Sequence, residues 1–253
     1  MNGITIYTHG DEPALRNAAE RLRMIGVSVV DAPNENVTHL LCSIPSFDRE
    51  GRLKGGGHLE DLLSKLPEDI TIIGGNLPKD AFANHSVIDL LHDELYLAEN
   101  AAITADCAMA LARQHLDVIW KGCPVLILGW GRIGKCLAQL LRNAGADVTI
   151  AARKVTDIAM LKALGYGADH IYHLYYGLLR YRVIFNTVPQ PVLRQEQTAH
   201  CREDCLLVEL ASTPGIDGKG VISALGLPGK MAPESSGRLI ANTTIRALLG
   251  KEY

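Results

Sequence analysis

A strong charge of either sign is missing from this sequence. Its 253 residues carry 25 basic and 28 acidic side chains, which leaves a formal net charge of −3. Binding to nucleic acid needs a concentrated basic face, so we expect no nucleic-acid partner. Long hydrophobic runs are missing too, since no apolar stretch approaches the roughly 20 residues that cross a bilayer, and no membrane contact is expected. The opening residues, MNGITIYTHGDEP, lack the basic-then-apolar pattern of a secretory signal. We therefore expect a cytoplasmic protein.

Paired cysteine motifs are also lacking. The six cysteines are scattered, and only His200, Cys201 and Cys205 resemble half of a metal site. A structural zinc site needs four ligands, and no second CxxC or HxxxH pair completes this one. We therefore expect reduced packing thiols and no metal. No internal repeat is visible, and no signature of a metalloprotease, a nucleophile elbow or a kinase is present.

The sequence does contain short apolar runs that alternate with segments of helical periodicity. This alternation is typical of parallel α/β layers. Many alanines give residues 98–115 a strong helix propensity, and this segment reads as one long helix between two lobes. The predicted strands are residues 4–7, 27–30, 39–42, 70–73, 125–128, 148–151, 183–185 and 206–210, and the other predicted helices are residues 14–24, 58–66 and 234–249.

The predicted architecture is therefore a two-lobe α/β protein. A C-terminal Rossmann lobe with a doubly wound parallel sheet follows a smaller, flavodoxin-like N-terminal lobe, and the long crossover helix links them. The final helix has apolar residues spaced for one buried face, which suits packing back towards the first lobe. The predicted boundaries are 1–97 for the N-terminal domain, 98–120 for the crossover helix and linker, 121–235 for the Rossmann domain and 236–253 for the C-terminal helix.

The stretch LILGWGRIGKCLA can be read as two different phosphate-binding turns. Gly129, Gly134 and Lys135 spell most of a nucleotide-triphosphate P-loop, but a P-loop needs a hydroxyl after its lysine, and here that residue is Cys136. Gly129, Gly131 and Gly134 spell a dinucleotide-binding turn, with the strand VLIL before it and a helix after it. A second strand follows at the expected distance, so we favour the dinucleotide turn.

Each part of this turn has a physical role in holding a dinucleotide. Gly129 permits the tight turn, Gly131 lets the backbone approach the pyrophosphate, and Gly134 lets helix and strand pack closely. The phosphates then lie on the helix N-terminus, around Arg132 and Ile133, where free N–H groups favour negative charge.

The end of the second strand of this lobe indicates which cofactor is bound. An NAD enzyme usually has an acid there, whereas this chain has Ala152, followed by Arg153 and Lys154. A guanidinium and an ammonium can hold a 2′-phosphate through charge-assisted hydrogen bonds, which favours NADP over NAD. The alternative is that the two cations belong only to a solvated turn.

Other candidate residues follow the remaining strands, because ligands bind at the carboxyl ends of parallel strands. One set comes after the third strand of the second lobe, and a smaller set, Ala211 and Ser212, comes after the fourth. Ser235 and Ser236 lie where a Gly/Pro loop feeds the last helix, and there they can cap it or bind an anion, or merely form a turn. The set after the third strand is Asn186, Thr187, Val188 and Pro189.

Several of these motifs together resemble the A subunit of dipicolinate synthase. The resemblance is carried by AENAAITADCAMALARQHLDVIWKGCPVLILGWGRIG, AARK, FNTVP, ELASTPG and ALGLPGKMAPESSGRLIAN, and more loosely by HLLCSIPSFDREG in the first lobe. It implies NADP in the C-terminal lobe. It also implies oxidation of a small cyclic dicarboxylate, dihydrodipicolinate, to the pyridine-2,6-dicarboxylate of bacterial spores. A flavoprotein-like second subunit is the implied partner, and a homodimer is a further expectation.

The resemblance also suggests residues for the substrate site. Asp106 is a candidate base or a structural helix cap at the start of the crossover helix, and Thr104 lies beside it. Ser43 and Ser212 are further candidates for the chemistry. The remaining matched positions are Ser46, Ser235 and Ser236 for substrate, and Gly129, Gly131, Arg132, Gly134, Arg153, Asn186–Pro189, Ala211 and Gly229 for cofactor.

Two other functions remain open at this point. A non-catalytic NADPH-binding subunit or sensor would use the same turn without turnover. Another two-lobe NADP dehydrogenase acting on a different small carboxylate would share the fold. Substrate turnover separates the first of these from a dipicolinate synthase, and the identity of the product separates the second.

Overall fold

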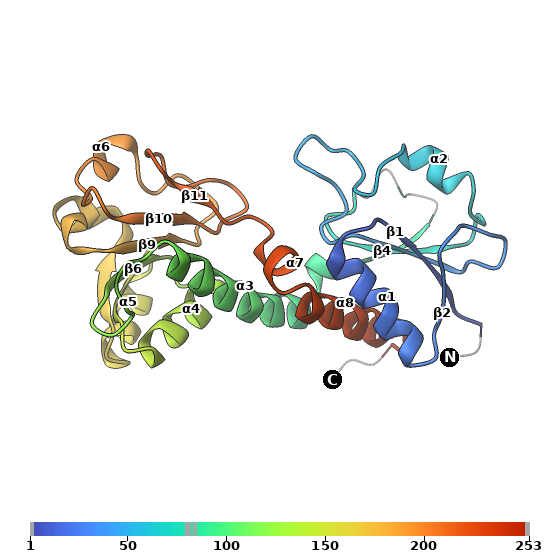
Figure 1. The fold of residues 1–253 in the computed structure, drawn as a ribbon, viewed down its shortest axis with the longest axis horizontal. Coiled ribbons are helices and arrows are strands. Elements are labelled where there is room, and N and C mark those ends of the chain that lie inside the picture. The colour runs from blue at the N-terminus through green and yellow to red at the C-terminus, as the bar shows by residue number, and fades with distance from the viewer. Residues whose placement is uncertain (1–2, 79–81, 83–84, 251–253) are drawn as a thin grey trace. The chain divides into compact units, whose positions relative to one another are not determined.

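The computed structural model describes residues 3–78, 82 and 85–250. The chain forms two compact units: unit 1 combines Met1–Asn100 with Pro228–Tyr253, and unit 2 is Ala101–Leu227 (Figure 1). The boundary falls inside the helix α3 (Glu94–Gln114), which belongs partly to each unit. No helix in the described part of the chain is long and apolar enough to cross a membrane.

Unit 1 is built on a five-stranded parallel sheet with the order β2-β1-β3-β4-β5. This is the flavodoxin-type order, in which the chain reverses direction across the sheet between β1 and β3. The strands are β1 (Thr5–His9), β2 (Ser28–Val30), β3 (His39–Cys42), β4 (Thr71–Gly74) and β5 (Ser86–Asp89), with helices α1 (Pro13–Met24), α2 (Leu59–Leu63) and α8 (Pro233–Leu248).

The helices α1 and α8 pack closely within unit 1. The buried residues of α1 fall at helical spacing, which gives the helix one apolar face. Gly237 of α8 permits the contact, because a Cβ there would lie 2.5 Å from Asn17 Cβ and 2.6 Å from Ala14 O. The chain's last helix therefore completes the core of its first lobe.

An ion pair fixes the other end of α8 within unit 1. Arg246 Nη2 donates to both carboxylate oxygens of Asp93, at 2.8 and 2.9 Å. Asp93 also caps α3, since its Oδ1 accepts from the Tyr96 N–H at 2.7 Å. Burial opposes ionisation of this carboxyl, but the hydrogen bonds from Tyr96 and Arg246 outweigh it and lower the pKa of Asp93.

We expect Asp93→Asn to lower the free energy of unfolding by about 1 kcal/mol at pH 7, because solvent screens part of the pair. A depressed pKa in the folded state stabilises the protein above the pKa of the unfolded chain, about 3.9, and this contribution is lost as pH falls through the folded value. Urea unfolding at pH 7 and pH 3 measures the difference. A difference of the same size at both pH values would contradict the role of the charge.

Unit 2 is built on a six-stranded parallel sheet with the order β11-β10-β9-β6-β7-β8. This is the Rossmann order, which reverses between β6 and β9. The strands are β6 (Pro124–Leu128), β7 (Asp147–Ala152), β8 (Gly167–His170), β9 (Val183–Asn186), β10 (Leu206–Glu209) and β11 (Ile222–Ser223), and the helices are α4 (Arg132–Asn143), α5 (Val155–Ala163), α6 (Gln195–Thr198) and α7 (Leu227–Met231), the last at the unit boundary. The predicted fold class is therefore confirmed in both units.

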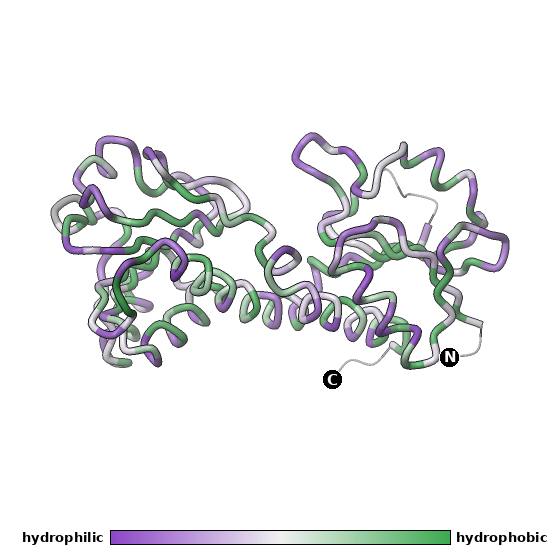
Figure 2. Tube along the Cα trace, in the orientation of Figure 1, coloured by the Kyte–Doolittle hydropathy of each residue, from purple (hydrophilic) through white to green (hydrophobic). Residues whose placement is uncertain are grey.

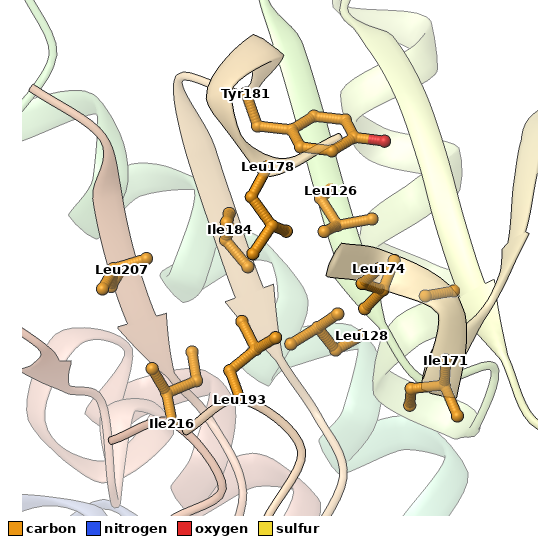
Figure 3. Close-up of a cluster of buried hydrophobic side chains, with 11 residues drawn as sticks. Leu126, Leu128, Ile171, Leu174, Leu178, Tyr181, Ile184, Leu193, Leu207 and Ile216 are labelled. Carbon is orange, nitrogen blue, oxygen red and sulfur yellow. The ribbon is translucent and has the colours of Figure 1, made fainter. Parts of the chain in front are cut away.

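Both faces of the central part of this sheet are buried, so its central strands read as continuous apolar runs in the sequence. Figure 2 shows hydrophobic residues concentrated along the strands and hydrophilic residues in the connecting loops. On one face, Leu126, Ile184 and Leu207 from neighbouring strands meet Leu174 and Leu178 (Figure 3). Cys201 and Cys205 pack partly buried against this cluster, as expected for packing thiols.

Some elements differ from the sequence predictions. The strands β5, β8 and β11, which lie at or near sheet edges, were not predicted. The sequences of β8 (GADH) and β11 (IS) are too short or too polar to give an apolar signal. The helix α3 begins at Glu94 rather than at residue 98, because Asp93 caps it. The tyrosine-rich segment 172–182, for which no element was predicted, contains the short 3₁₀ helices η3 (Ile171–Tyr176) and η4 (Leu178–Arg180).

Candidate functional site

The turn between β6 and α4 requires glycine at its first position. Gly129 has a φ of +104°, a conformation that side chains of L-residues rarely adopt. A Cβ there would also lie 2.5 Å from Thr187 Oγ1 and 2.8 Å from Val188 Cγ2. Thr187 is fixed in turn, because both its N–H and its hydroxyl donate to Leu128 O, at 2.9 and 2.8 Å. The turn is therefore packed against the end of the neighbouring strand β9.

The other two glycines of the turn have opposite surroundings. A Cβ on Gly134 would lie 2.4 Å from Gly129 O, so the helix and the turn touch through their backbones. A Cβ on Gly131 would meet nothing within 4 Å. Gly131 is the N-cap of α4 and has no side chain to accept from the first N–H groups of the helix. The open space beside Gly131 is thus where an anion can approach them.

The start of α4 suits an anion in its charge as well. No acidic residue lies in the first turn of this helix, and the macrodipole places positive partial charge there. Arg132 is exposed and Ile133 half-buried at the first two helical positions. The residues present therefore fit a bound pyrophosphate.

A cavity of about 380 Å³ opens beside this turn, wholly within unit 2. Its wall comes from the turn itself, from the end of β7 and from the segment that follows β9. It is lined by Gly129, Trp130, Gly131, Ala152, Arg153, Lys154, Asp157, Ile171, Tyr172 and residues 187–192.

The cationic end of this cavity lies just after β7. Arg153 and Lys154 are both exposed, and no other side chain within the described residues holds either of them by a hydrogen bond or ion pair. Asp157, in the first turn of α5, is the one acid among the lining residues. Two free cations on a cavity rim can hold a phosphate, whereas the acid that would bind ribose hydroxyls is missing at the strand end.

An aromatic residue inside the glycine motif supports the same wall. The Trp130 ring meets the Tyr166 ring edge-on at 6.0 Å, and Lys135 Nζ lies 5.8 Å from the Trp130 ring centre. The Arg142 guanidinium stacks over the Tyr166 ring, 4.2 Å from its centre. The P-loop interpretation would place Lys135 on a phosphate, whereas its exposed side chain here lies over an aromatic ring.

A buried carboxylate orders the part of the site that follows β9 and β10. Glu209 is 4% exposed, and both its oxygens accept from Asn186 Nδ2, at 2.8 and 3.1 Å. Its Oε1 also accepts from Ala211 N at 3.0 Å, and its Oε2 from Gly215 N at 2.7 Å and Ile216 N at 3.0 Å. Asn186 in turn binds the N–H and the carbonyl of Val188. Glu209 thus ties together the ends of two strands.

This network explains which of the residues predicted near β9 line the cavity. Thr187, Val188 and Pro189 line it, whereas Asn186 is fully buried behind them and positions them. Ala211 is buried and its N–H serves Glu209, while Ser212 is exposed after β10. Sequence reasoning missed Glu209. Its only signal is an acid as the last residue of the otherwise apolar strand LLVE.

The two predicted serines of unit 1 lie after β3. Ser43 is buried, and its hydroxyl donates to the Glu12 carboxylate. Ser46 is fully buried, and its hydroxyl donates to Ser43 O at 2.9 Å and accepts from Gly75 N at 3.0 Å. The hydroxyl of Ser46 is thus used in hydrogen bonds that hold the fold together. Ser43 instead contacts Glu12, an acid that the sequence analysis did not identify.

The expectation that Asp106 caps the crossover helix is wrong. Because α3 begins at Glu94, Thr104 and Asp106 lie in its middle rather than at its start. Asp93 has the capping role instead. Asp106 is exposed and Thr104 is buried, so the two residues point to different surroundings.

The expectation that Ser235 or Ser236 caps the last helix is also wrong. The helix α8 begins with Pro233, and its N-cap is Ala232, which makes no side-chain hydrogen bond. The two serines therefore lie inside the first turns, and Ser236 Oγ is buried with no partner among the described residues. Gly229 lies in α7, in unit 1, and is not among the residues that line the unit 2 cavity.

The chain is similar to known proteins in both sequence and structure. No family model matches the chain. The dipicolinate synthase A subunit of Bacillus subtilis (strain 168) is 28% identical over 204 residues, covering 75% of this chain and 68% of the relative. The crystal structure of the dipicolinate synthase A subunit from Bacillus halodurans superposes with a TM-score of 0.84 at 23% identity, covering 99% of each chain.

A structure of lower sequence identity has the same fold. A transhydrogenase from Sinorhizobium meliloti superposes with a TM-score of 0.71 at 14% identity, over 96% of this chain and 93% of that one. At that identity the likeness concerns the fold alone. The sequence match to the Bacillus subtilis protein is evidence of relationship as well as of fold, and it agrees with the resemblance of the motifs. The chain is a homologue of the A subunit of dipicolinate synthase.

Proposed function

We propose that this chain is an NADP-dependent oxidoreductase that converts dihydrodipicolinate to dipicolinate. The proposal rests on the unit 2 cavity. Its lining includes the open glycine turn at Gly131 and two cations, Arg153 and Lys154, that form no ion pair among the described residues. The Bacillus subtilis relative, by its name a part of dipicolinate synthase, supplies the substrate class. The substrate and the choice of NADP over NAD both belong to this proposal.

The proposed cofactor contacts follow from the geometry. The N–H groups at the start of α4 bind the pyrophosphate beside Gly131, and Arg153 and Lys154 bind the 2′-phosphate. Thr187 and Val188 form the wall at the end of β9, held by Asn186 and Glu209. Bound NADP would supply the hydride acceptor of the reaction.

The chemistry asks little of the protein beyond orientation. Loss of a hydride and a proton makes the substrate ring aromatic, which provides the driving force, so the protein has mainly to hold the ring against the cofactor. The relative is one subunit of its enzyme. We therefore extend the proposal to a second, flavoprotein-like subunit, whose co-purification with this chain from a shared expression system tests it.

The cofactor proposal predicts a strong preference of the purified protein for NADPH. We expect NADPH to bind at least tenfold more tightly than NADH, about 1.4 kcal/mol, in titrations that follow nicotinamide fluorescence. Arg153→Ala should remove most of this preference by weakening NADPH binding and leaving NADH binding unchanged, because only NADPH carries the phosphate. Lys162→Ala is the matched control, since Lys162 is also an exposed cation of the α5 segment but lies outside the cavity lining.

The outcomes of this titration separate the functions. Equal binding of both cofactors would contradict the role of Arg153 and leave an NAD-type oxidoreductase. Tight NADPH binding followed by formation of dipicolinate from dihydrodipicolinate and NADP would support the whole proposal. Tight binding with no turnover, even with the second subunit, would favour a non-catalytic NADPH-binding subunit.

A further inference from the structure

Two cysteines of unit 2 lie on either side of a turn that joins α6 to β10. Cys201 follows α6, and Cys205 comes directly before β10. The Cys205 N–H donates to Arg202 O at 3.0 Å, which closes the turn, and the Cys201 N–H donates to Thr198 O at 3.0 Å. Both cysteine side chains pack against the same hydrophobic cluster of the sheet. The backbone therefore holds both thiols on one side of the turn.

The two thiols are in contact with each other. The thiol of Cys205 donates a hydrogen bond to the sulfur of Cys201. A disulfide can form only where two cysteine side chains are close and are turned toward one another. The contact between Cys201 and Cys205 meets that requirement in the folded chain.

The same contact makes the two sulfurs chemically different. The hydrogen bond from Cys205 lowers the pKa of Cys201, although burial opposes this. That hydrogen bond and burial both raise the pKa of Cys205. The nearby Asp204 carboxylate adds to the rise, while the Arg182 guanidinium opposes it. The thiolate, and not the thiol, is the nucleophilic form of cysteine, so Cys201 is the sulfur that attacks first.

The turn between the two cysteines is open to small molecules. The cysteines are half-buried, and residues 202–204 between them are exposed. These three residues and Leu179 line a cavity of about 600 Å³. Cys42, Cys107 and Cys123, in contrast, are buried. A small oxidant in solvent therefore reaches the pair at this turn before it reaches those thiols.

We propose that Cys201 and Cys205 form a site of reversible oxidation, at which hydrogen peroxide converts the two thiols to a disulfide. The Cys201 thiolate attacks one peroxide oxygen, so that an S–O bond forms, the O–O bond breaks and hydroxide leaves. The Cys205 sulfur then attacks the Cys201 sulfur, so that the S–S bond forms and the S–O bond breaks. The second hydroxide leaves here, and the protons of the two thiols convert both hydroxides to water. The two sulfurs lose two electrons, which the peroxide gains.

The disulfide would lie at the opposite end of β10 from the cofactor cavity. Pairing of this strand begins directly after Cys205, where the Leu206 N–H donates to Arg182 O at 2.9 Å. Glu209, which holds the wall of the cavity, is the last residue of the same strand. None of residues 201–205 lines that cavity. The oxidation uses neither NADP nor dihydrodipicolinate, so this inference and the proposed function can fail independently.

Peptide mapping by mass spectrometry tests the site. The reduced full-length chain is treated with an equimolar amount of hydrogen peroxide, denatured, alkylated with iodoacetamide and digested with trypsin. Trypsin cleaves after Arg202, so Cys201 and Cys205 fall in separate peptides, residues 195–202 and 203–219. We expect these peptides to be joined, with a loss of two hydrogens, and to separate on addition of dithiothreitol. Since the disulfide uses two of the six cysteines, four should remain for alkylation.

Single substitutions separate the roles of the two sulfurs. Cys205→Ser removes the second sulfur, so the sulfenic acid of Cys201 should persist and react with dimedone on peptide 195–202. Cys201→Ser should remove both the dimedone adduct and the linked peptides. Cys136→Ser is the matched control, because Cys136 is another half-buried cysteine of unit 2, in α4, and this variant should give the linked peptides as the wild type does.

Two results would overturn the proposal. The first is full alkylation of both Cys201 and Cys205 after peroxide treatment of wild-type protein whose circular dichroism shows it to be folded. The second is a disulfide that joins either of them to a different cysteine. Either result would mean that the contact between the two thiols serves only the packing of the turn.

Discussion

Glu209→Ala should strongly destabilise unit 2. It leaves Asn186 Nδ2 and the N–H groups of Ala211, Gly215 and Ile216 buried without their acceptor. Each unsatisfied buried donor costs about 1–3 kcal/mol, so we expect a loss of about 4 kcal/mol or more. At roughly 2–4 °C per kcal/mol for a protein of this size, Tm in calorimetry should fall by about 10 °C.

The binding of NADPH should weaken in the same variant. The Thr187–Val188 wall of the cavity is held by Asn186, and Asn186 is held by Glu209. Gly215 shows how tightly this region is packed, because a Cβ there would lie 2.5 Å from both Asn186 Nδ2 and Gln190 O. Without this support the wall can adopt other conformations. NADPH then binds only the fraction of molecules in which the wall is ordered, so its apparent affinity falls.

Two further variants test whether the lost hydrogen bonds of Glu209 cause the destabilisation. Glu209→Gln keeps the shape but replaces one acceptor oxygen by a donor that faces other donors, so its loss should lie between those of wild type and Glu209→Ala. Glu203→Ala, at an exposed acid of the same unit, should stay within about 0.5 kcal/mol of wild type. A Tm for Glu209→Ala within about 2 °C of wild type, less than 1 kcal/mol, would show that water replaces the carboxylate, against this prediction.

The sequence predicted the buried strands of unit 2 well, because a parallel sheet covered on both faces leaves uninterrupted apolar runs. The runs VLIL and VIF have that pattern and lie in the centre of the sheet. The dinucleotide turn was predictable for a related reason. Its glycines are local requirements of φ and of close backbone contact, as at Gly129, so the motif is contiguous in the chain.

The parts that the sequence missed depend on contacts between distant segments. Glu209 and Asn186 are 23 positions apart, and no spacing rule joins an acid that ends one strand to an amide that ends another. Likewise, His9 and Gly56 lie 47 positions apart and meet only because the loop of glycines 55–57 folds over the end of β1. The start of the crossover helix was missed for a local reason, since Asp93 caps α3 and the helix begins at Glu94 rather than at the predicted residue 98. The last helix begins at Pro233, one residue before the predicted start.

Gly131→Ala should abolish most NADPH binding while leaving the fold almost unchanged. The backbone at Gly131, with φ −83° and ψ −167°, is open to any residue, and a Cβ there meets nothing within 4 Å. We expect a stability loss below about 1 kcal/mol, the usual size of a change at a helix N-cap. The added methyl group occupies the space through which the pyrophosphate reaches the N–H groups of α4, so NADPH affinity should fall about 10- to 100-fold.

Gly134→Ala is the natural counterpart, because its Cβ would lie 2.4 Å from Gly129 O and the helix must move away from the turn. Overpacking of this kind costs about 1–3 kcal/mol, so this variant should lose both stability and NADPH affinity. Fluorescence titration and thermal unfolding of the two proteins side by side measure the contrast. If Gly131→Ala bound NADPH as the wild type does, the phosphates could not lie against this turn. The glycines would then serve only the close packing of α4 on β6. That is the role expected of them in a site that no longer binds a cofactor.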